Sequence, residues 1–450
     1  MKHLLLCSLL FTTLVASAQT WTKVGTGTDG KVSVLTPYSD GLAVGGKFKR
    51  INEFNRINTC LIRENSNGDY AYLSNYSDDF DQRSSTAKEQ GTEVSAFAGF
   101  NHRLHVGGQF FNPGYLSEVG MGYFEIDTAT DQTVFMGYAE QTTAGEQILC
   151  LKSFDEKLFI GGRFNHSVAY IQSDDYPNPM VMPAGTNLSG VVHSLEVFRD
   201  TLYAGGYFTV SDTDTVVQAN IAWWNDGQWM ALDSTLDSTI FTLLTFKDKL
   251  YAGGAFGRDS ASLQRIAAWD GASWSAVGSG FNDSADVVYA LAVYSDTLYA
   301  GGVLNKSGLL ELNNLAQLDN GQWHPLGTGT NDTVFCMQAY RGRLYIGGVF
   351  QIANELICRN LVAYNNGKEK TGVIDPYSEA ASLRLYPNPA SDRVTASDAV
   401  SMQLMNMQGT IIRQSSGNSM DLNGLSKGHY VVSVVKTDGS SGFEQLLIVR

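Results

Sequence analysis

The sequence predicts an all-β protein built mainly from one repeated, four-stranded unit. The first observation is a short apolar segment ending in a pair of glycines, which occurs seven times at intervals of 44 to 62 residues. A constant motif over such distances indicates a repeat architecture. The first glycines of the pairs are Gly45, Gly107, Gly161, Gly205, Gly253, Gly301 and Gly347.

The second observation is the fixed spacing around each pair. Four residues before the leucine of each copy stands an aromatic residue: Tyr38, Phe100, Phe154, Phe198, Phe246, Tyr294 and Tyr340. Three residues before each aromatic stands an apolar residue: Leu35, Phe97, Leu151, Leu195, Leu243, Leu291 and Met337. We therefore interpret the glycine pairs as packing devices, because a strand without side chains lets its neighbours approach closely.

One unit divides into four predicted strands. They run over Val191–Phe198, Leu202–Gly206, Asn220–Trp224 and Trp229–Asp233. Asn225-Asp226-Gly227 forms the last turn, because Asx-Gly pairs adopt the positive φ angles of a tight hairpin. Four antiparallel strands in about 46 residues are typical of a propeller blade. We predict a seven-bladed β-propeller over residues 19–367.

The ends of the array predict how it closes. The seventh copy ends with a strand at Asn360–Tyr364 and has no fourth strand after it. The segment Trp21–Gly25 matches the fourth strands Trp274–Gly278 and Trp323–Gly327 of other copies. We expect this N-terminal strand to complete the seventh blade, which removes exposed sheet edges.

The remaining segments predict an exported protein. Residues 1–18 read as a signal peptide, with Lys2, an apolar run Leu4–Val15 and a small-residue cleavage site at Ala16–Ala18. No later run has the length of a transmembrane helix. The formal net charge of −14 disfavours nucleic acid and anionic membranes as partners. Residues 368–381 read as a linker, and residues 382–450 as a small second β domain.

The C-terminal domain resembles the type A sorting domain of the type IX secretion system of the Bacteroidetes. The motif residues are Tyr386, Pro387, Asn388, Pro389, Gly409, Gly428 and Tyr430. The chain ends in Leu-Ile-Val-Arg where this family usually has a lysine. The resemblance implies a β-sandwich that interacts with the secretion machinery and guides the protein from the periplasm to the outside. Such domains are often removed on release or on attachment to surface lipopolysaccharide.

The repeats resemble kelch-type propeller blades over Trp21–Gly367. In that family a strand ending in a glycine pair is followed by an aromatic-bearing strand and a tryptophan. The resemblance implies a fold and no particular activity, because propellers serve many functions.

Motifs with possible chemistry are weak. Gly25-Thr-Gly27-Thr-Asp-Gly30 matches a dinucleotide pattern, but it leads into a strand instead of a helix, so we interpret it as a turn between blades. The acidic loops at Asp78–Asp81, Asp174–Asp175 and Asp212–Asp214 lack the spacing of a calcium site, and we favour solvated loops. We predict no catalytic, cofactor-binding or metal-ligating residues and no cofactor.

The cysteine, histidine and tryptophan residues also do not predict a catalytic or metal-binding site. Cys150 and Cys336 hold equivalent positions, where small buried residues are favoured over a disulfide. His105 replaces the tyrosine of the glycine-pair strand, which favours a core or edge role. Of the adjacent Trp223 and Trp224, one could be exposed. Six histidines follow the signal segment, scattered over the chain: His102, His105, His166, His193, His324 and His429.

Two functions remain open. The first is a non-catalytic binding or adhesion protein, secreted or displayed on the cell surface, that recognises a protein or glycan through its loops. The alternative is an extracellular hydrolase or lyase acting on polysaccharide, with carboxylates and tyrosines at the propeller axis. Ionisable side chains converging at the axis would favour the enzyme, and small or apolar side chains there would count against it.

Overall fold

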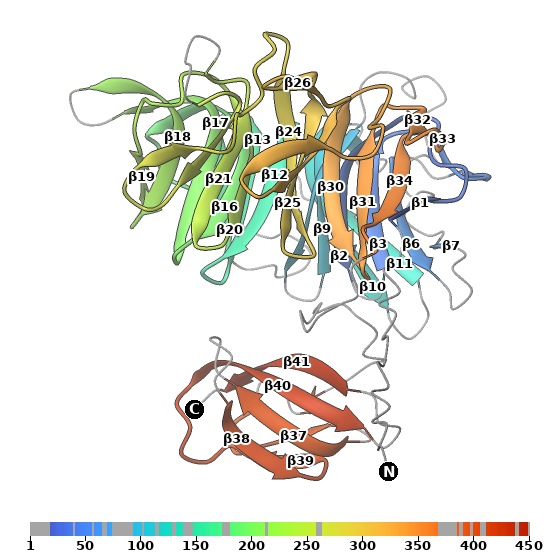
Figure 1. Cartoon of the computed structure of the whole chain (residues 1–450). Coiled ribbons are helices and arrows are strands. Elements are labelled where there is room, and N and C mark those ends of the chain that lie inside the picture. The colour runs from blue at the N-terminus through green and yellow to red at the C-terminus, as the bar shows by residue number, and fades with distance from the viewer. Residues whose placement is uncertain are drawn as a thin grey trace, which may run out of the picture. The chain divides into compact units, whose positions relative to one another are not determined.

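The computed structural model describes residues 19–38, 41–55, 58–64, 70–73, 93–100, 103–112, 117–127, 132–137, 147–172, 181–211, 215–257, 263–367, 385–386, 390–396, 399–405, 411–436 and 441–448. The predicted signal segment and linker lie outside these residues. All regular elements among them are β-strands (Figure 1). The chain forms two compact units, the first reaching Thr371 and the second ending at Arg450.

The described strands of the first unit form seven four-stranded antiparallel sheets. The first strands are β2 (Lys31–Tyr38), β8 (Glu93–Phe100), β12 (Gln147–Phe154), β16 (Leu188–Phe198), β20 (Ile240–Phe246), β24 (Val287–Tyr294) and β30 (Val334–Tyr340). The second strands are β3 (Gly41–Lys47), β9 (Arg103–Asn112), β13 (Lys157–Arg163), β17 (Thr201–Ser211), β21 (Lys249–Gly254), β25 (Thr297–Val303) and β31 (Arg343–Gly348). All seven glycine pairs lie in second strands, as predicted.

The outer strands complete each sheet. The third strands are β6 (Thr59–Glu64), β10 (Ser117–Asp127), β14 (Val168–Ile171), β18 (Val216–Asn225), β22 (Ile266–Trp269), β28 (Leu315–Asp319) and β34 (Leu361–Asn365). The fourth strands are β7 (Tyr70–Leu73), β11 (Gln132–Gly137), β15 (Val181–Pro183), β19 (Gln228–Ala231), β23 (Trp274–Ala276), β29 (Gln322–Pro325) and β1 (Thr20–Lys23). We number the sheets 1 to 7 in the order of their first strands.

The N-terminal strand completes sheet 7, as predicted. β1 pairs antiparallel with β34, placing Trp21 opposite Tyr364 and Lys23 opposite Val362. The Trp21 ring lies 5.0 Å from the Tyr364 ring, centroid to centroid. Residues from both ends of the first unit therefore share one sheet, whose order is β1-β34-β31-β30.

The hairpin turns follow the predicted chemistry, with one correction to a strand end. Asp226 and Gly227 have φ angles of 44° and 95°, and Arg199 and Asp200 have 47° and 57°, as tight hairpin turns require. The prediction that the second strand stops at its glycine pair is wrong for β17, which continues to Ser211. It can continue because β18 begins early, at Val216, and pairs with this extension.

The glycine pairs are packing devices at both positions. A Cβ atom on the first glycine would press on a β-branched residue of the next sheet, at 2.5 Å from Val288 for Gly253 and 2.7 Å from Val334 for Gly301. A Cβ atom on the second glycine would overlap a backbone oxygen of its own sheet's first strand, such as that of Val191 for Gly206. The pair thus allows close approach both between sheets and within a sheet.

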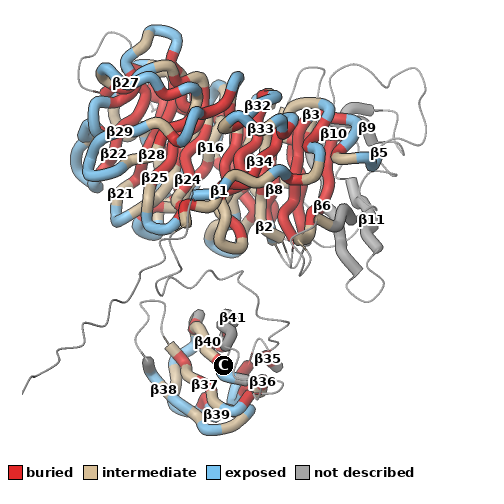
Figure 2. Tube along the Cα trace, turned by 45° about the vertical axis from the view of Figure 1, so that its right-hand side comes forward, coloured by how far each residue is buried: buried red, intermediate tan, exposed pale blue. Residues whose placement is uncertain are grey.

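The hydrophobic core of the first unit is divided into layers between consecutive sheets. One layer joins sheets 3 and 4 through residues such as Phe159 and Trp229, and another joins sheets 6 and 7 through Tyr299 and Tyr364. Figure 2 shows buried residues running along the strands of these sheets. Consecutive first strands, from β2 to β24, also contact one another. Each sheet therefore depends on its neighbours for burial.

Short hairpins follow the glycine pairs of sheets 1, 6 and 7. They are β4–β5 (Arg50–Ile51, Phe54–Asn55), β26–β27 (Lys306–Ser307, Leu310–Glu311) and β32–β33 (Ile352–Ala353, Leu356–Ile357). Two of them donate a backbone hydrogen bond to a Gly-Thr-Gly loop: Asn52 N donates to Gly27 O at 2.7 Å, and Asn354 N donates to Gly329 O at 2.8 Å. The Gly25–Gly30 segment is therefore a structural turn, as predicted.

The second unit contains two sheets around one core. One sheet has the order β35 (Leu385–Tyr386), β36 (Arg393–Ala396), β39 (Ser419–Asp421); the other has β38 (Ile411–Ser416), β37 (Ala399–Met405), β40 (Gly428–Lys436), β41 (Ser441–Ile448). Val394 of the first sheet and Leu404 and Val432 of the second belong to the same buried cluster. β39 was not expected from the sequence, because it is short and has one buried residue, Met420.

Candidate functional site

The first strands share a β-bulge opposite the glycine pair. It occurs in β2, β8, β12, β16, β20 and β24. The extra residue of each bulge is half-buried, whereas the residue before it is buried. With the equivalent residue of β30, these positions form what we call the bulge ring: Ser33, Ser95, Leu149, His193, Phe241, Tyr289 and Phe335.

Four consecutive sheets contribute an aromatic side chain to the bulge ring. The centroid of the His193 ring lies 4.8 Å from that of Phe241. Phe241 and Tyr289 are also 4.8 Å apart, and Tyr289 and Phe335 are 5.2 Å apart. The interplanar angles of 44° to 59° are those of tilted aromatic pairs, which attract beyond their buried area. We call these four residues the aromatic arc.

Polar side chains continue the ring across sheets 7, 1, 2 and 3. Lys31 Nζ lies 4.2 Å from the centre of the Phe335 ring and 2.8 Å from Glu93 Oε1. The Ser33 hydroxyl also donates to Glu93 Oε1. Gln147 Nε2 donates to Ser95 Oγ at 3.0 Å. We call Lys31, Ser33, Glu93, Ser95 and Gln147 the polar arc, and we count Lys31, Glu93 and Gln147, which each stand two residues before a bulge residue, with the bulge ring.

The side chains of the bulge ring carry little net charge. Burial and, to a smaller extent, the charge of Arg163 together lower the pKa of His193 to about 4, so the imidazole is uncharged at neutral pH. Lys31 and Glu93 carry opposite charges at ion-pair distance. The aromatic arc therefore presents uncharged rings, and the polar arc presents hydroxyl, amide and paired charged groups.

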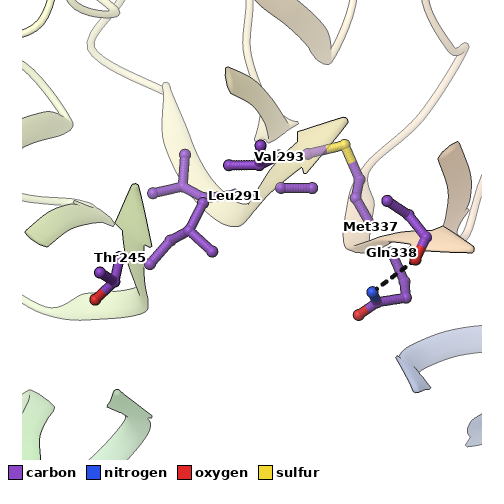
Figure 3. A pocket seen from close by; sticks show the side chains of 8 residues that line it. Thr245, Leu291, Val293, Met337 and Gln338 are labelled. Atoms are coloured by element: carbon purple, nitrogen blue, oxygen red, sulfur yellow. Dashed lines mark hydrogen bonds between the residues drawn. The ribbon is translucent and has the colours of Figure 1, made fainter. Parts of the chain in front are cut away.

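A small pocket of about 200 Å³ lies toward the other end of three first strands. Its lining is mostly aliphatic, with Leu291 and Val293 from β24, Met337 from β30 and Thr245 from β20 (Figure 3). Gln338 Nε2 donates to Ala339 O at 2.9 Å. The pocket has few polar groups and presents no catalytic set.

A third group of polar side chains lies between sheets 1 and 7. Arg343 Nη2 lies 2.9 Å from Glu64 Oε1, and Arg343 Nη1 donates to the Tyr70 hydroxyl at 3.0 Å. The Tyr70 and Tyr345 hydroxyl oxygens are 3.5 Å apart. Burial raises the pKa of both tyrosines, so both stay protonated at neutral pH and neither is a base. The group joins the two sheets.

The other candidate residues have structural positions. Cys60, Cys150, Cys336 and Cys358 are free thiols. Burial raises the pKa of Cys150 and Cys336, which are therefore poor nucleophiles at neutral pH. His105 is fully buried, with its ring 5.7 Å from that of Phe100, which confirms a core role. Trp223 and Trp224 are both half-buried, so the expectation of one exposed ring is wrong.

The acidic loops and the scattered histidines are the remaining candidates from the sequence. Asp78–Asp81, Asp174–Asp175, Asp212–Asp214 and His102 lie outside the described residues. His166 and His324 are exposed. Among the residues that the structure describes, no cluster of three or more His, Cys, Asp or Glu side chains could hold a metal ion. Within the same residues no helix is long and apolar enough to cross a membrane.

The sorting-motif residues that are described lie on strands of the second unit, and Tyr430 belongs to its core. Tyr386 pairs with Thr395, and Gly428 begins β40 with a φ of 149°. Tyr430 is 9% exposed, and its hydroxyl donates to Ser426 O at 2.9 Å. This resembles a tyrosine corner, in which a buried tyrosine fixes the chain a few residues upstream. Pro387, Asn388, Pro389 and Gly409 lie outside the described residues.

Comparison with known families identifies this second unit. Residues 384–449 match the model of the secretion system C-terminal sorting domain. The chain thus carries a type IX sorting tail, which indicates export to the cell surface or secretion and interaction with the secretion machinery. A search of curated proteins gave no match.

Several solved structures are distantly similar to the chain. The extracellular domain of a hybrid two-component system from B. thetaiotaomicron is 11% identical with a TM-score of 0.47, over 96% of this chain and 59% of that one. A second such domain from the same organism is 10% identical with a TM-score of 0.32, over 93% and 68%. YjhT is 11% identical with a TM-score of 0.37, over 75% and 95%. Similarity at this level carries no argument about function.

The bulge ring was missed by sequence reasoning. Its members stand two residues before the fixed apolar position of each repeat, so a signal was present. Comparing that position between copies gives His, Phe, Tyr and Phe in the last four. The residue type differs between copies, and only strand pairing with its bulge reveals that these side chains meet.

Proposed function

We propose that residues 19–367 form a seven-bladed β-propeller closed between its first and seventh sheets. Three contacts between these sheets support closure. Cys336 Sγ lies 3.8 Å from Val32 O, Lys31 lies over the Phe335 ring, and Arg343 pairs with Glu64. The bulge ring adds a further argument, because its contacts run from sheet 4 through sheet 7 to sheets 1, 2 and 3. In this arrangement the first strands surround the axis.

We further propose that this propeller is a non-catalytic binding module that acts outside the cell. The observation that carries the proposal is the aromatic arc, four half-buried rings that touch one another at the end of the sheets where the loops after the glycine pairs begin. Binding sites are typically lined by aromatic side chains with a few placed polar groups. Such rings are held by their neighbours, so little entropy is lost when a ligand binds.

The alternative of a hydrolase or lyase has less support in the described residues. The carboxylates of the first strands are Glu93 and Glu196. Lys31 lies 2.8 Å from Glu93, and Lys152 lies 2.7 Å from Glu196. Each carboxylate is therefore already engaged in an ion pair, and the two lie on sheets 2 and 4, which are not consecutive. The two carboxyl groups of a glycoside hydrolase flank the same scissile bond, and this pair does not match that arrangement.

The domain order completes the proposal. Residues 1–18 act as the export signal, 368–381 as a linker, and 382–450 as the sorting domain. Within it, the sorting motif consists of Tyr386, Pro387, Asn388, Pro389, Gly409, Gly428 and Tyr430. The kelch-like character of the repeats belongs to the same proposal and specifies architecture only.

Affinity capture tests the binding function. The purified full chain and its Phe241→Ala/Tyr289→Ala variant are immobilised side by side and exposed to extracellular proteins and to a glycan array. We expect the wild-type chain to retain at least one ligand that the variant loses, while thermal unfolding shows both chains folded. Retention of the same ligands by both chains would contradict a role for the aromatic arc.

A further inference from the structure

Apart from the aliphatic Leu149, the bulge ring has two chemically different parts. The aromatic arc offers the faces and edges of Phe241, Tyr289 and Phe335 together with a neutral imidazole. The polar arc offers the hydroxyls of Ser33 and Ser95 and the amide of Gln147. Hydroxyl and amide groups can each donate and accept hydrogen bonds. A ligand that suits both parts must itself have an apolar face and closely spaced hydrogen-bonding groups.

The charges of the bulge ring limit the classes of ligand that fit it. The chain has a formal net charge of −14. In the bulge ring, by contrast, the charges of Lys31 and Glu93 are paired at 2.8 Å. Arg163, at the exposed end of β13, is the charged group that acts on His193. Recognition of phosphate or sulfate typically relies on several cationic donors, often bidentate arginine. The ring does not present such a set, so a neutral ligand fits it better than a polyanion.

We propose that the bulge ring binds neutral carbohydrate, with the aromatic arc against the C–H face of a sugar ring and the polar arc on its hydroxyls. A pyranose has both features, because its axial hydrogens form an apolar face and its equatorial hydroxyls project from the rim. The C–H groups carry a small positive charge and favour the negative face of an aromatic ring. This inference rests on the proposed binding function and specifies its ligand class.

Isothermal titration of the full chain with neutral oligosaccharides derived from β-glucan, xylan, mannan and chitin tests the inference. Oligogalacturonides and sulfated oligosaccharides serve as charged probes. We expect saturable binding of at least one neutral oligosaccharide and weaker binding of the charged probes. Phe241→Leu, which keeps apolar volume and removes the aromatic face, should weaken binding by about tenfold. Ser95→Ala should weaken it by a smaller factor.

The matched control is Phe246→Leu, the same substitution at the other end of the same strand. Five residues along a strand separate the two side chains by roughly 16 Å. Phe246→Leu should leave binding unchanged, and thermal unfolding of all variants shows whether each is folded. Equal loss in folded Phe246→Leu and Phe241→Leu chains would contradict a site in the bulge ring.

The outcomes separate this inference from the binding function itself. If no neutral oligosaccharide binds, or if charged probes bind more tightly, the carbohydrate assignment is wrong. In that case the capture of a protein by the wild-type chain, and its loss in the Phe241→Ala/Tyr289→Ala variant, would leave the binding function standing. If capture is also independent of the arc, both proposals fail.

Discussion

Val32 and Gly347 come from opposite ends of the first unit, and the Val32 side chain packs on Gly347 between sheets 1 and 7. A Cβ atom on Gly347 would lie 2.6 Å from Cγ1 of Val32 and 2.7 Å from Sγ of Cys336. The same arrangement joins the other consecutive sheets, where the first glycine of one sheet faces a Val or Ile of the next. The contact is therefore the repeated sheet-to-sheet contact, made once more across the ends of the array.

Gly347→Ala should destabilise the first unit. The added methyl group would press on two buried side chains, and overpacking of this kind costs about 1–3 kcal/mol. Urea unfolding followed by tyrosine and tryptophan fluorescence measures the change. Gly99→Ala is the control, because a Cβ atom there would meet nothing within 4 Å. Equal effects of the two substitutions would show that the Val32 contact is unimportant.

His193 should make stability depend on pH. Its folded pKa is about 4, below the ordinary value of 6.5. Between these values the unfolded chain binds a proton that the folded chain does not, so stability falls as the pH drops from 6.5 toward 4, by up to about 3 kcal/mol. His193→Phe keeps an aromatic ring in the arc and should remove this part of the pH dependence. Unfolding free energies of both chains at pH 7 and pH 4 provide the comparison, and parallel losses would contradict the assignment.

Trp21→Ala should destabilise sheet 7. The Trp21 ring packs at 5.0 Å on the fully buried Tyr364, and deletion of a large aromatic side chain from a packed site costs about 3–5 kcal/mol. Because Trp21 is only half-buried, we expect the lower end of that range. Loss of β1 would also expose the edge of β34, which favours aggregation. Thermal unfolding combined with light scattering tests both effects, with Thr20→Ala as the control at an exposed position of the same strand.

Removal of the sorting tail should stop export. Deletion of residues 382–450 in the native host should retain the protein inside the cell envelope, as shown by fractionation and immunoblotting. Continued export of the deleted chain would exclude the sorting role.

Tyr430→Phe should lower the stability of the second unit. It removes the hydrogen bond to Ser426 O, which should cost the second unit about 1 kcal/mol of unfolding free energy. Tyr430→Ala should cost several times more, because it also opens a cavity in the core.

Local rules explain which parts of this fold were predictable. The glycine pairs, hairpin turns and the Trp21 strand each carry a physical requirement that few residues satisfy, and all were found where expected. The extension of β17 and the short β39 were missed, since the first depends on the early start of β18 at Val216 and the second on pairing with β36. The bulge ring was missed for another reason: His193 and Phe335 stand at the same position of the repeat, but the residue type there differs between copies, and only the contacts between consecutive sheets show that the rings of the arc meet.

The pairing of β1 with β34 also affects how the protein folds. Sheets 1 to 6 are each built from one continuous segment, whereas sheet 7 needs residues from both ends of the array. Non-local pairings slow folding, because the chain loses entropy before the contact forms. Completion of sheet 7 should therefore be the last and slowest step. A circular permutant that places residues 19–25 directly after residue 367 would turn this pairing into a local hairpin, and we expect it to reach the same architecture faster.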